Sequence, residues 1–136
     1  IGDFNGTNFY DDYGHHPTEI KATTKALKNN TSGKLIVIFQ PHRFTRTRDN
    51  YEDLRDSFDH SDLTLITDIY SAGEKPIPGI SSVMFEGKDI QYMKSPRLVP
   101  HFIKNNINPG DTVLTIGAGD ITLLGPQILK YLNENK

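Results

Sequence analysis

Leu35-Ile36-Val37-Ile38-Phe39 is the stretch that decides the fold. It is continuously apolar and rich in β-branched residues, and polar and basic residues follow it at once. A strand that is covered on both faces has this character, whereas a strand with one solvated face alternates apolar and polar residues. We therefore predict a buried strand in a mostly parallel sheet.

Four further β-rich runs are predicted as strands, and patterns of helical spacing lie between them. Pro100 falls within one helical pattern, so that helix is predicted to begin late or to lose one backbone hydrogen bond. The alternation predicts a three-layer, doubly wound, mostly parallel α/β sheet of the Rossmann-like kind. The further strands are Thr7–Tyr10, Leu63–Thr67, Ile90–Met93 and Thr112–Ile116. The helical patterns are Glu19–Leu27, Asp49–Phe58, Ser81–Gly87, Ser95–Asn106 and Ile121–Asn133.

Residues 1–136 have the size of a single domain with one core. The formal net charge of -2 gives no global basic field, so neither nucleic-acid nor membrane-surface binding is expected. The absence of cysteine excludes disulfides and thiolate chemistry, and it favours a cytoplasmic location. No apolar run approaches the roughly 20 residues that span a bilayer. Because the chain begins at Ile1 without Met, we expect a domain of a longer protein.

The stretch Asp11–Glu19, with the sequence DDYGHHPTE, gathers carboxylates, a phenol and imidazoles at a predicted strand-to-helix turn. Asp12 could accept hydrogen bonds from a ribose, Tyr13 could stack on a base, and His15 or His16 could face an anion at the helix start. Alternatively, the acids cap the turn and the histidines are exposed. A metal site is disfavoured, because adjacent histidines in an extended chain point to opposite sides and no distant ligand pair is evident.

A second polar stretch, Gln40–Arg48, follows the most hydrophobic strand and contains His42 and three arginines. The planar fork of a guanidinium matches a carboxylate or a phosphate in a bidentate manner, so Arg43 and Arg46 are candidates for an anion clamp. The alternative is a solvated basic loop that pairs with the acids that follow it. These acids are Asp49, Glu52 and Asp53.

Two further polar stretches follow predicted strands. Tyr70–Lys75 lies in a long loop, Ser71–Ser82, and is either a lid over the site or a simple loop. Gly117–Asp120 resembles the start of a dinucleotide fingerprint, but Thr122 stands where the third glycine belongs. A structural turn is favoured there, although its backbone N–H groups could bind a small carboxylate. The chain contains no phosphate loop, so any ATP phosphates must be held by another domain.

In this order, the stretches Asp11–Glu19, Gln40–Thr47 and Tyr70–Glu74 resemble the C-terminal domain of the bacterial Mur ligases that join L-alanine to UDP-N-acetylmuramate. The resemblance implies an ATP-dependent amide ligase of peptidoglycan synthesis, in which a muramyl acyl phosphate is attacked by the amine of L-alanine. It also implies an N-terminal domain for the UDP-sugar and a central domain for ATP and Mg²⁺, against which this domain packs. The isolated domain is then expected to be inactive.

The resemblance further implies a division of roles within the site. Asp12 would contact the ATP ribose, and Tyr13 would lie against adenine. Arg43 and Arg46 would neutralise the alanine carboxylate and steady the tetrahedral intermediate, with His15 as a candidate for the general base. The residues that would line the amino-acid side are His15, His42, Arg43, Arg46, Gly117 and Ala118.

Two other interpretations remain at this point. A murein tripeptide ligase shares the His-His-Pro turn but is expected to lack the clamp that follows Gln40. A receiver-type signalling domain also has paired acids after its first strand and an aspartate after its third, here Asp68. That fold needs a lysine after its last strand, and Gly117–Asp120 contains none.

Overall fold

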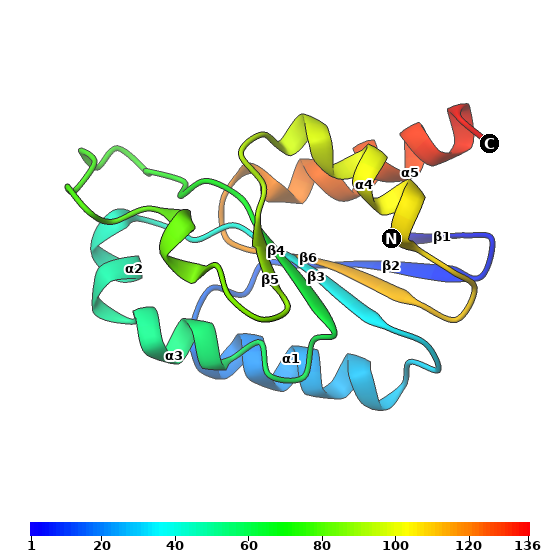
Figure 1. The fold of residues 1–136 in the computed structure, drawn as a ribbon, viewed down its shortest axis with the longest axis horizontal. Helices are drawn as coiled ribbons and strands as arrows, with labels where there is room; N and C mark the ends of the chain where they lie inside the picture. The colour runs from blue at the N-terminus through cyan, green and yellow to red at the C-terminus, as the bar shows by residue number, and fades with distance from the viewer.

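The computed structural model describes residues 1–136 and contains one six-stranded mixed sheet with helices on both faces (Figure 1). Short 3₁₀ turns lie at Ser82–Phe85, Pro96–Leu98 and Asp120–Leu123. The strands are β1 (Gly2–Phe4), β2 (Thr7–Asp12), β3 (Leu35–Phe39), β4 (Leu63–Ile66), β5 (Ile90–Tyr92) and β6 (Thr112–Ile116). The helices are α1 (Pro17–Asn29), α2 (Phe44–Asp49), α3 (Tyr51–Asp56), α4 (Val99–Asn106) and α5 (Leu124–Glu134).

The sheet has the order β1-β2-β6-β3-β4-β5, and every neighbouring pair except β1 and β2 is parallel. The helices α1 and α3 cover one face, whereas α4 and α5 cover the other (Figure 1). The predicted three-layer, mostly parallel α/β fold is confirmed. A receiver-type domain has the parallel order 2-1-3-4-5, so the position of β6 between β2 and β3 excludes that alternative.

The central strand β3 explains why the sheet needs helices on both faces. All five of its residues are fully buried. Ile36 and Ile38 pack into the core beneath α4 and α5, while Leu35, Val37 and Phe39 pack into the core over α1 and α3. Successive side chains of a strand point to opposite faces, so a continuous apolar run contributes to two cores at once.

The helices differ from the sequence prediction in where they begin. The helix predicted at Asp49–Phe58 is present as α3, two residues shorter at each end, whereas α2, which begins at Phe44, was not predicted. The pattern Ser81–Gly87 forms only a 3₁₀ turn. Pro100 lies in the first turn of α4, where its missing N–H breaks no helical bond, so the late start is confirmed.

Strand β1 has no counterpart in the sequence prediction, because its three residues, Gly-Asp-Phe, lack a β-rich pattern. It pairs antiparallel with β2 through a tight turn at Asn5 and Gly6, both of which have positive φ angles.

None of the helices has the length and apolar character that a membrane-crossing segment requires.

Candidate functional site

The predicted polar stretches meet at one edge of the sheet, where the parallel strands end. Backbone hydrogen bonds continue between the loops beyond the strands: Gly117 N–H donates to Asp12 O at 3.1 Å, and Gln40 N–H donates to Ile116 O at 3.2 Å. Ligands of doubly wound sheets bind at this carboxyl edge. The loops after β2, β6, β3 and β4 are therefore one structural unit, although they are far apart in the sequence.

Asp12 shapes the turn that leads from β2 into α1. Its Oδ1 accepts a hydrogen bond from Gly14 N–H at 2.7 Å, and its Oδ2 accepts one from the Thr23 hydroxyl at 3.0 Å. Tyr13, the neighbouring residue, leaves 63% of its surface exposed. The turn thus holds Asp12 in place and leaves the Tyr13 ring free for a planar partner.

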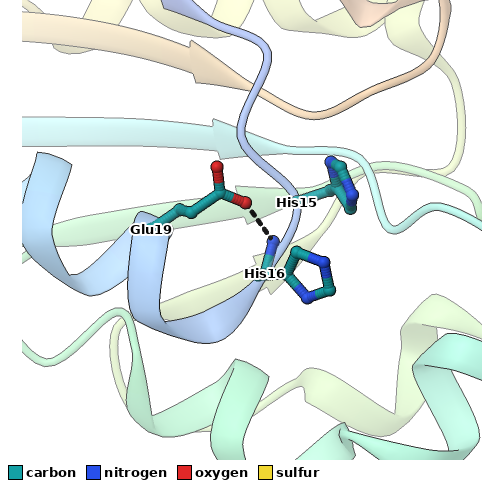
Figure 2. Close-up of side chains that lie close together, drawn as sticks. All are labelled: His15, His16 and Glu19. Carbon is teal, nitrogen blue, oxygen red and sulfur yellow. Dashed lines mark hydrogen bonds between the residues drawn. The ribbon is translucent and has the colours of Figure 1, made fainter.

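The start of α1 is built by His16, Pro17 and Glu19. The Glu19 carboxylate accepts a hydrogen bond from the N–H of His16 at 3.2 Å, which is one half of a capping box (Figure 2). This bond to the His16 N–H is the largest cause that lowers the pKa of Glu19 below its usual value. The anion-binding N–H groups at this helix start are therefore already partly satisfied by the chain itself.

The two adjacent histidines do not point to opposite sides. The ring centroids of His15 and His16 are only 4.6 Å apart (Figure 2), although His16 has an extended backbone and α1 begins only at Pro17. Ligating atoms of His15, His16 and Glu19 lie within 4.8 Å of one another. The prediction that the two histidines point to opposite sides, which disfavoured a metal site, is therefore wrong. The Glu19 carboxylate, however, already accepts the hydrogen bond of the helix cap.

The basic stretch is not a loop throughout, because Arg46 and Arg48 lie on α2. The cap residue of α2 is Arg43, whose backbone has a φ of 71° and whose side chain makes no capping bond. Glu74 supplies the cap instead: its carboxylate accepts hydrogen bonds from Phe44 N–H at 2.6 Å, from Thr45 N–H at 3.1 Å and from the Thr45 hydroxyl at 2.5 Å. The stretch Tyr70–Lys75 is thus anchored to the basic stretch.

The His42 ring lies at the centre of the site. Its Nδ1 is 3.2 Å from an Nη atom of Arg46, and a guanidinium can only donate, so Nδ1 accepts and the imidazole is neutral. Burial lowers the pKa of His42, and the positive charges of Arg46 and Arg43 lower it further. The ring stacks on Tyr70 at 5.6 Å and lies 6.0 Å from His15, measured between ring centroids.

The arginines of the basic stretch differ in their partners. Arg48 pairs with Asp49 at 2.9 Å, as the solvated-loop alternative predicts. Neither Arg43 nor Arg46 has a carboxylate oxygen within the 4.0 Å of an ion pair, and neither Glu52 nor Asp53 pairs with an arginine. Arg43 and Arg46 therefore form no ion pair, although the Glu74 carboxylate is near enough to Arg43 for their charges to interact, and both guanidiniums lie beside His42. Guanidiniums without an ion-pair partner are available to bind an anion.

The turn after β6 packs tightly against the other loops. Gln40 bridges it, because its side-chain amide donates to Asp120 at 2.6 Å and its Oε1 accepts from Ile121 N–H at 3.2 Å. Gly117 N–H is already bonded to Asp12 O, so it is not free for the small carboxylate that the sequence suggested. The N–H groups of Ala118 and Gly119 donate to no protein acceptor and remain available.

The structure brings His15, His42 and Arg46 into one group, with Arg43 at the start of α2 beside it. Tyr13 stands apart on the surface. His15 Nδ1 is buried and has no hydrogen-bond partner, which leaves one acceptor or donor of the group open. Sequence reasoning assigned no role to Gln40 or Glu74, whose partners lie 80 and 30 residues away and leave no local pattern.

The fold and the site define a doubly wound α/β domain with two arginines that form no ion pair at the carboxyl edge of its sheet, where such domains bind their ligands. The chain belongs to the Mur ligase family: the model described as "Mur ligase, glutamate ligase domain" matches residues 1–119. UDP-N-acetylmuramate–L-alanine ligases from Desulforamulus reducens and Pelotomaculum thermopropionicum are 40% and 41% identical to it over 98% and 99% of its length. The alignments cover 30% and 31% of those relatives.

Solved structures share the fold at low sequence identity. The UDP-N-acetylmuramate-alanine ligase of Thermotoga maritima superposes with a TM-score of 0.74 at 22% identity, covering 97% of this chain and 28% of that one. The murein peptide ligase of Psychrobacter arcticus superposes with a TM-score of 0.75 at 20% identity, again over 97% of this chain and 28% of the other. The fold therefore does not distinguish between these two kinds of ligase.

Proposed function

We propose that residues 1–136 form the C-terminal domain of an ATP-dependent ligase that joins L-alanine to UDP-N-acetylmuramate through an acyl phosphate. The observation that carries the proposal is the pair Arg43 and Arg46, which has no ion-pair partner within 4.0 Å and lies beside neutral His42. The relatives that are about 40% identical are named for this reaction, which supports alanine as the amino acid.

Within this function, the arginines hold the carboxylate of L-alanine and so place its amine toward the acyl phosphate. A fixed pair of guanidiniums neutralises one carboxylate and offsets the charge that develops in the tetrahedral intermediate. His42 donates through Nε2, since its Nδ1 accepts from Arg46. His15, whose Nδ1 is unpartnered, and Ala118, whose N–H is unbonded, line the same side.

On the nucleotide side, Asp12 contacts the ATP ribose and exposed Tyr13 lies against adenine. The chain spans about a third of the length of its relatives, and the remainder would hold ATP, Mg²⁺ and the UDP-sugar. Catalysis then depends on closure of this domain over the others, because positioning and charge stabilisation arise only when both halves meet. ATP and a UDP-sugar as substrates place the reaction in the cytoplasm.

The experiment is turnover by the full-length protein and by the 136-residue chain, with ATP, L-alanine and UDP-N-acetylmuramate. We expect the full-length protein to release ADP only when all three substrates are present, and the domain alone to release none. ADP release by the domain alone would contradict the proposed division of the site. Failure of the full-length protein to use alanine would contradict the proposed reaction.

A further inference from the structure

The Glu74 side chain caps the N-terminus of α2. Both of its carboxylate oxygens are engaged, one by the amides of Phe44 and Thr45 and the other by the Thr45 hydroxyl. The side-chain hydrogen bond from Thr45 is the largest cause that lowers the pKa of Glu74 below its usual value. The contact joins two loops that are 30 residues apart in sequence.

This contact lies next to a strained residue. Arg43 has φ 71° and ψ 142°, a strained backbone conformation that L-residues rarely adopt. Such a conformation persists only where its surroundings fix it. Here the Arg43 N–H donates to Tyr70 O at 2.8 Å, and the next residue's N–H is held by Glu74. Arg43 is therefore fixed from both sides by the loop that follows β4.

The same contact determines where Arg46 lies. Arg46 is on the first turn of α2, so the residue at which the helix begins sets the direction of its side chain. In the observed register, its guanidinium reaches His42 Nδ1 at 3.2 Å. A helix of six residues has little intrinsic stability, and the side chain of its cap residue does not satisfy its first amides. Glu74 does so in its place.

We propose that Glu74 is a positioning residue that preorganises the arginine pair by capping α2 and holding Arg43 in its strained conformation. It touches no reacting atom and acts through Arg43 and Arg46. The loop Tyr70–Lys75 would then stay in place and hold Arg43 and Arg46 in position. The kinetic consequence rests on the proposed alanine-adding function, whereas the structural consequence does not.

The kinetic experiment compares Glu74→Ala, Glu74→Gln and Glu86→Gln in the full-length ligase. Loss of a helix cap should raise the KM for L-alanine by about 10-fold in Glu74→Ala, while the KM for ATP stays within about 2-fold. Gln can accept from both amides through Oε1, so Glu74→Gln should recover most of this loss. Glu86 is exposed and its side chain makes no hydrogen bond, so Glu86→Gln should behave as the wild type.

The structural experiment uses NMR of the 136-residue chain. In the wild type we expect His42 Nδ1 to have the ¹⁵N shift of an acceptor nitrogen and the Phe44 and Thr45 amides to be protected from exchange. Glu74→Ala should abolish that protection and give His42 a mixture of tautomers. Thr45→Ala, which removes the exposed hydroxyl alone, should lower protection less and serves as the test if Glu74→Ala does not fold.

The outcomes separate the two proposals. If the full-length wild type does not use alanine, the proposed function fails, and the NMR experiment still decides the role of Glu74. If alanine is used but Glu74→Ala leaves its KM unchanged, or raises the KM for ATP equally, Glu74 does not position the clamp. Unchanged protection and an unchanged His42 tautomer in Glu74→Ala would overturn the inference independently of the reaction.

Discussion

His42 is kept neutral by what surrounds it. Burial lowers the pKa of its imidazole, and a second proton would also place a positive charge beside Arg46 and Arg43. The Arg46 guanidinium already donates to Nδ1. A neutral imidazole gives the clamp a hydrogen-bond donor at Nε2 without adding another charge. In the proposed function, the arginines would therefore bind a carboxylate without a third positive charge beside them.

We expect the pKa of His42 to lie below 6.5, since burial and then the nearby arginines oppose its protonation. Because the folded-state pKa is lower than the unfolded one, the contribution of His42 to stability is fully present above about pH 6.5 and is lost as the pH falls through the folded-state pKa. An NMR titration, with His42 assigned from a His42→Gln variant, measures this pKa. A midpoint at or above 6.5 would contradict the neutral ring.

Arg46→Ala in the full-length ligase should lower kcat/KM for L-alanine by about 100-fold, because loss of a charge-assisted contact to a carboxylate costs about 2–3 kcal/mol. ATP binding should persist. The matched control is Arg48→Ala, which removes a guanidinium that is already paired with Asp49 and should change the rate less than about 2-fold. Steady-state kinetics with alanine as the varied substrate measures kcat/KM for both variants. Equal losses of kcat/KM in Arg46→Ala and Arg48→Ala would show that Arg46 does not bind alanine.

Part of the residue-scale picture could be predicted from the sequence. The types of side chain in Asp11–Glu19 and Gln40–Arg48 indicated an anion-binding site, because guanidinium and imidazole chemistry depends on residue type alone. The partners could not be predicted: Thr23 for Asp12, Arg46 for His42 Nδ1, and Glu74 for the amides of α2. The second and third of these depend on a left-handed Arg43, which has no signature in the sequence.

Among the elements, the turn after β6 holds the loops together. Gly117 has φ 152°, and a Cβ there would lie 2.9 Å from Gln40 O and from Ile121 Cγ2. Both neighbours are fixed by hydrogen bonds or packing, so neither can move away without breaking the turn. The glycine is needed both for its backbone conformation and for the close approach of the loop after β3.

Gly117→Ala should therefore lower the free energy of unfolding by about 2–4 kcal/mol, from a clash added to backbone strain. Gly79→Ala is the matched control, because Gly79 has φ 82° with no atom within 4 Å of a built Cβ. Strain alone should lower the free energy of unfolding there by about 1 kcal/mol. Urea unfolding followed by circular dichroism measures both, and equal losses would show that the contact with Gln40 is not tight.

Elements with a strong apolar pattern were predicted well, and those that depend on distant partners were not. The strands β3 and β6 have the predicted bounds, because continuous burial leaves an unbroken apolar run. The helix at Asp49–Phe58 was predicted and forms as the shorter α3, whereas α2 was missed, since its first amides are capped by Glu74 from another loop. Strand β1 forms by pairing with the edge of β2. The sequence of its three residues does not predict a strand.

In the whole molecule, the polar loops gather at one edge of the sheet. The clamp and Tyr13 lie at the open carboxyl edge, and the chain covers about 30% of its relatives. Arg43 and Arg46 account only for the binding of an anion, and the chain has no phosphate loop. A ligase reaction would therefore require another part of the protein to bind ATP and the other substrate. A murein peptide ligase has the same fold, so the fold cannot distinguish the two reactions. They are distinguished by which amine substrate the full-length protein uses.

The most direct measurement is a competition between acceptors in the full-length ligase. Equal concentrations of L-alanine and of the L-alanyl-γ-D-glutamyl-diaminopimelate tripeptide are supplied with ATP and UDP-N-acetylmuramate, and the nucleotide-linked products are resolved by mass spectrometry. We predict that UDP-N-acetylmuramoyl-L-alanine is the dominant product and that Arg46→Ala lowers its rate of formation by about 100-fold. Preferential formation of the tripeptide product would contradict the account.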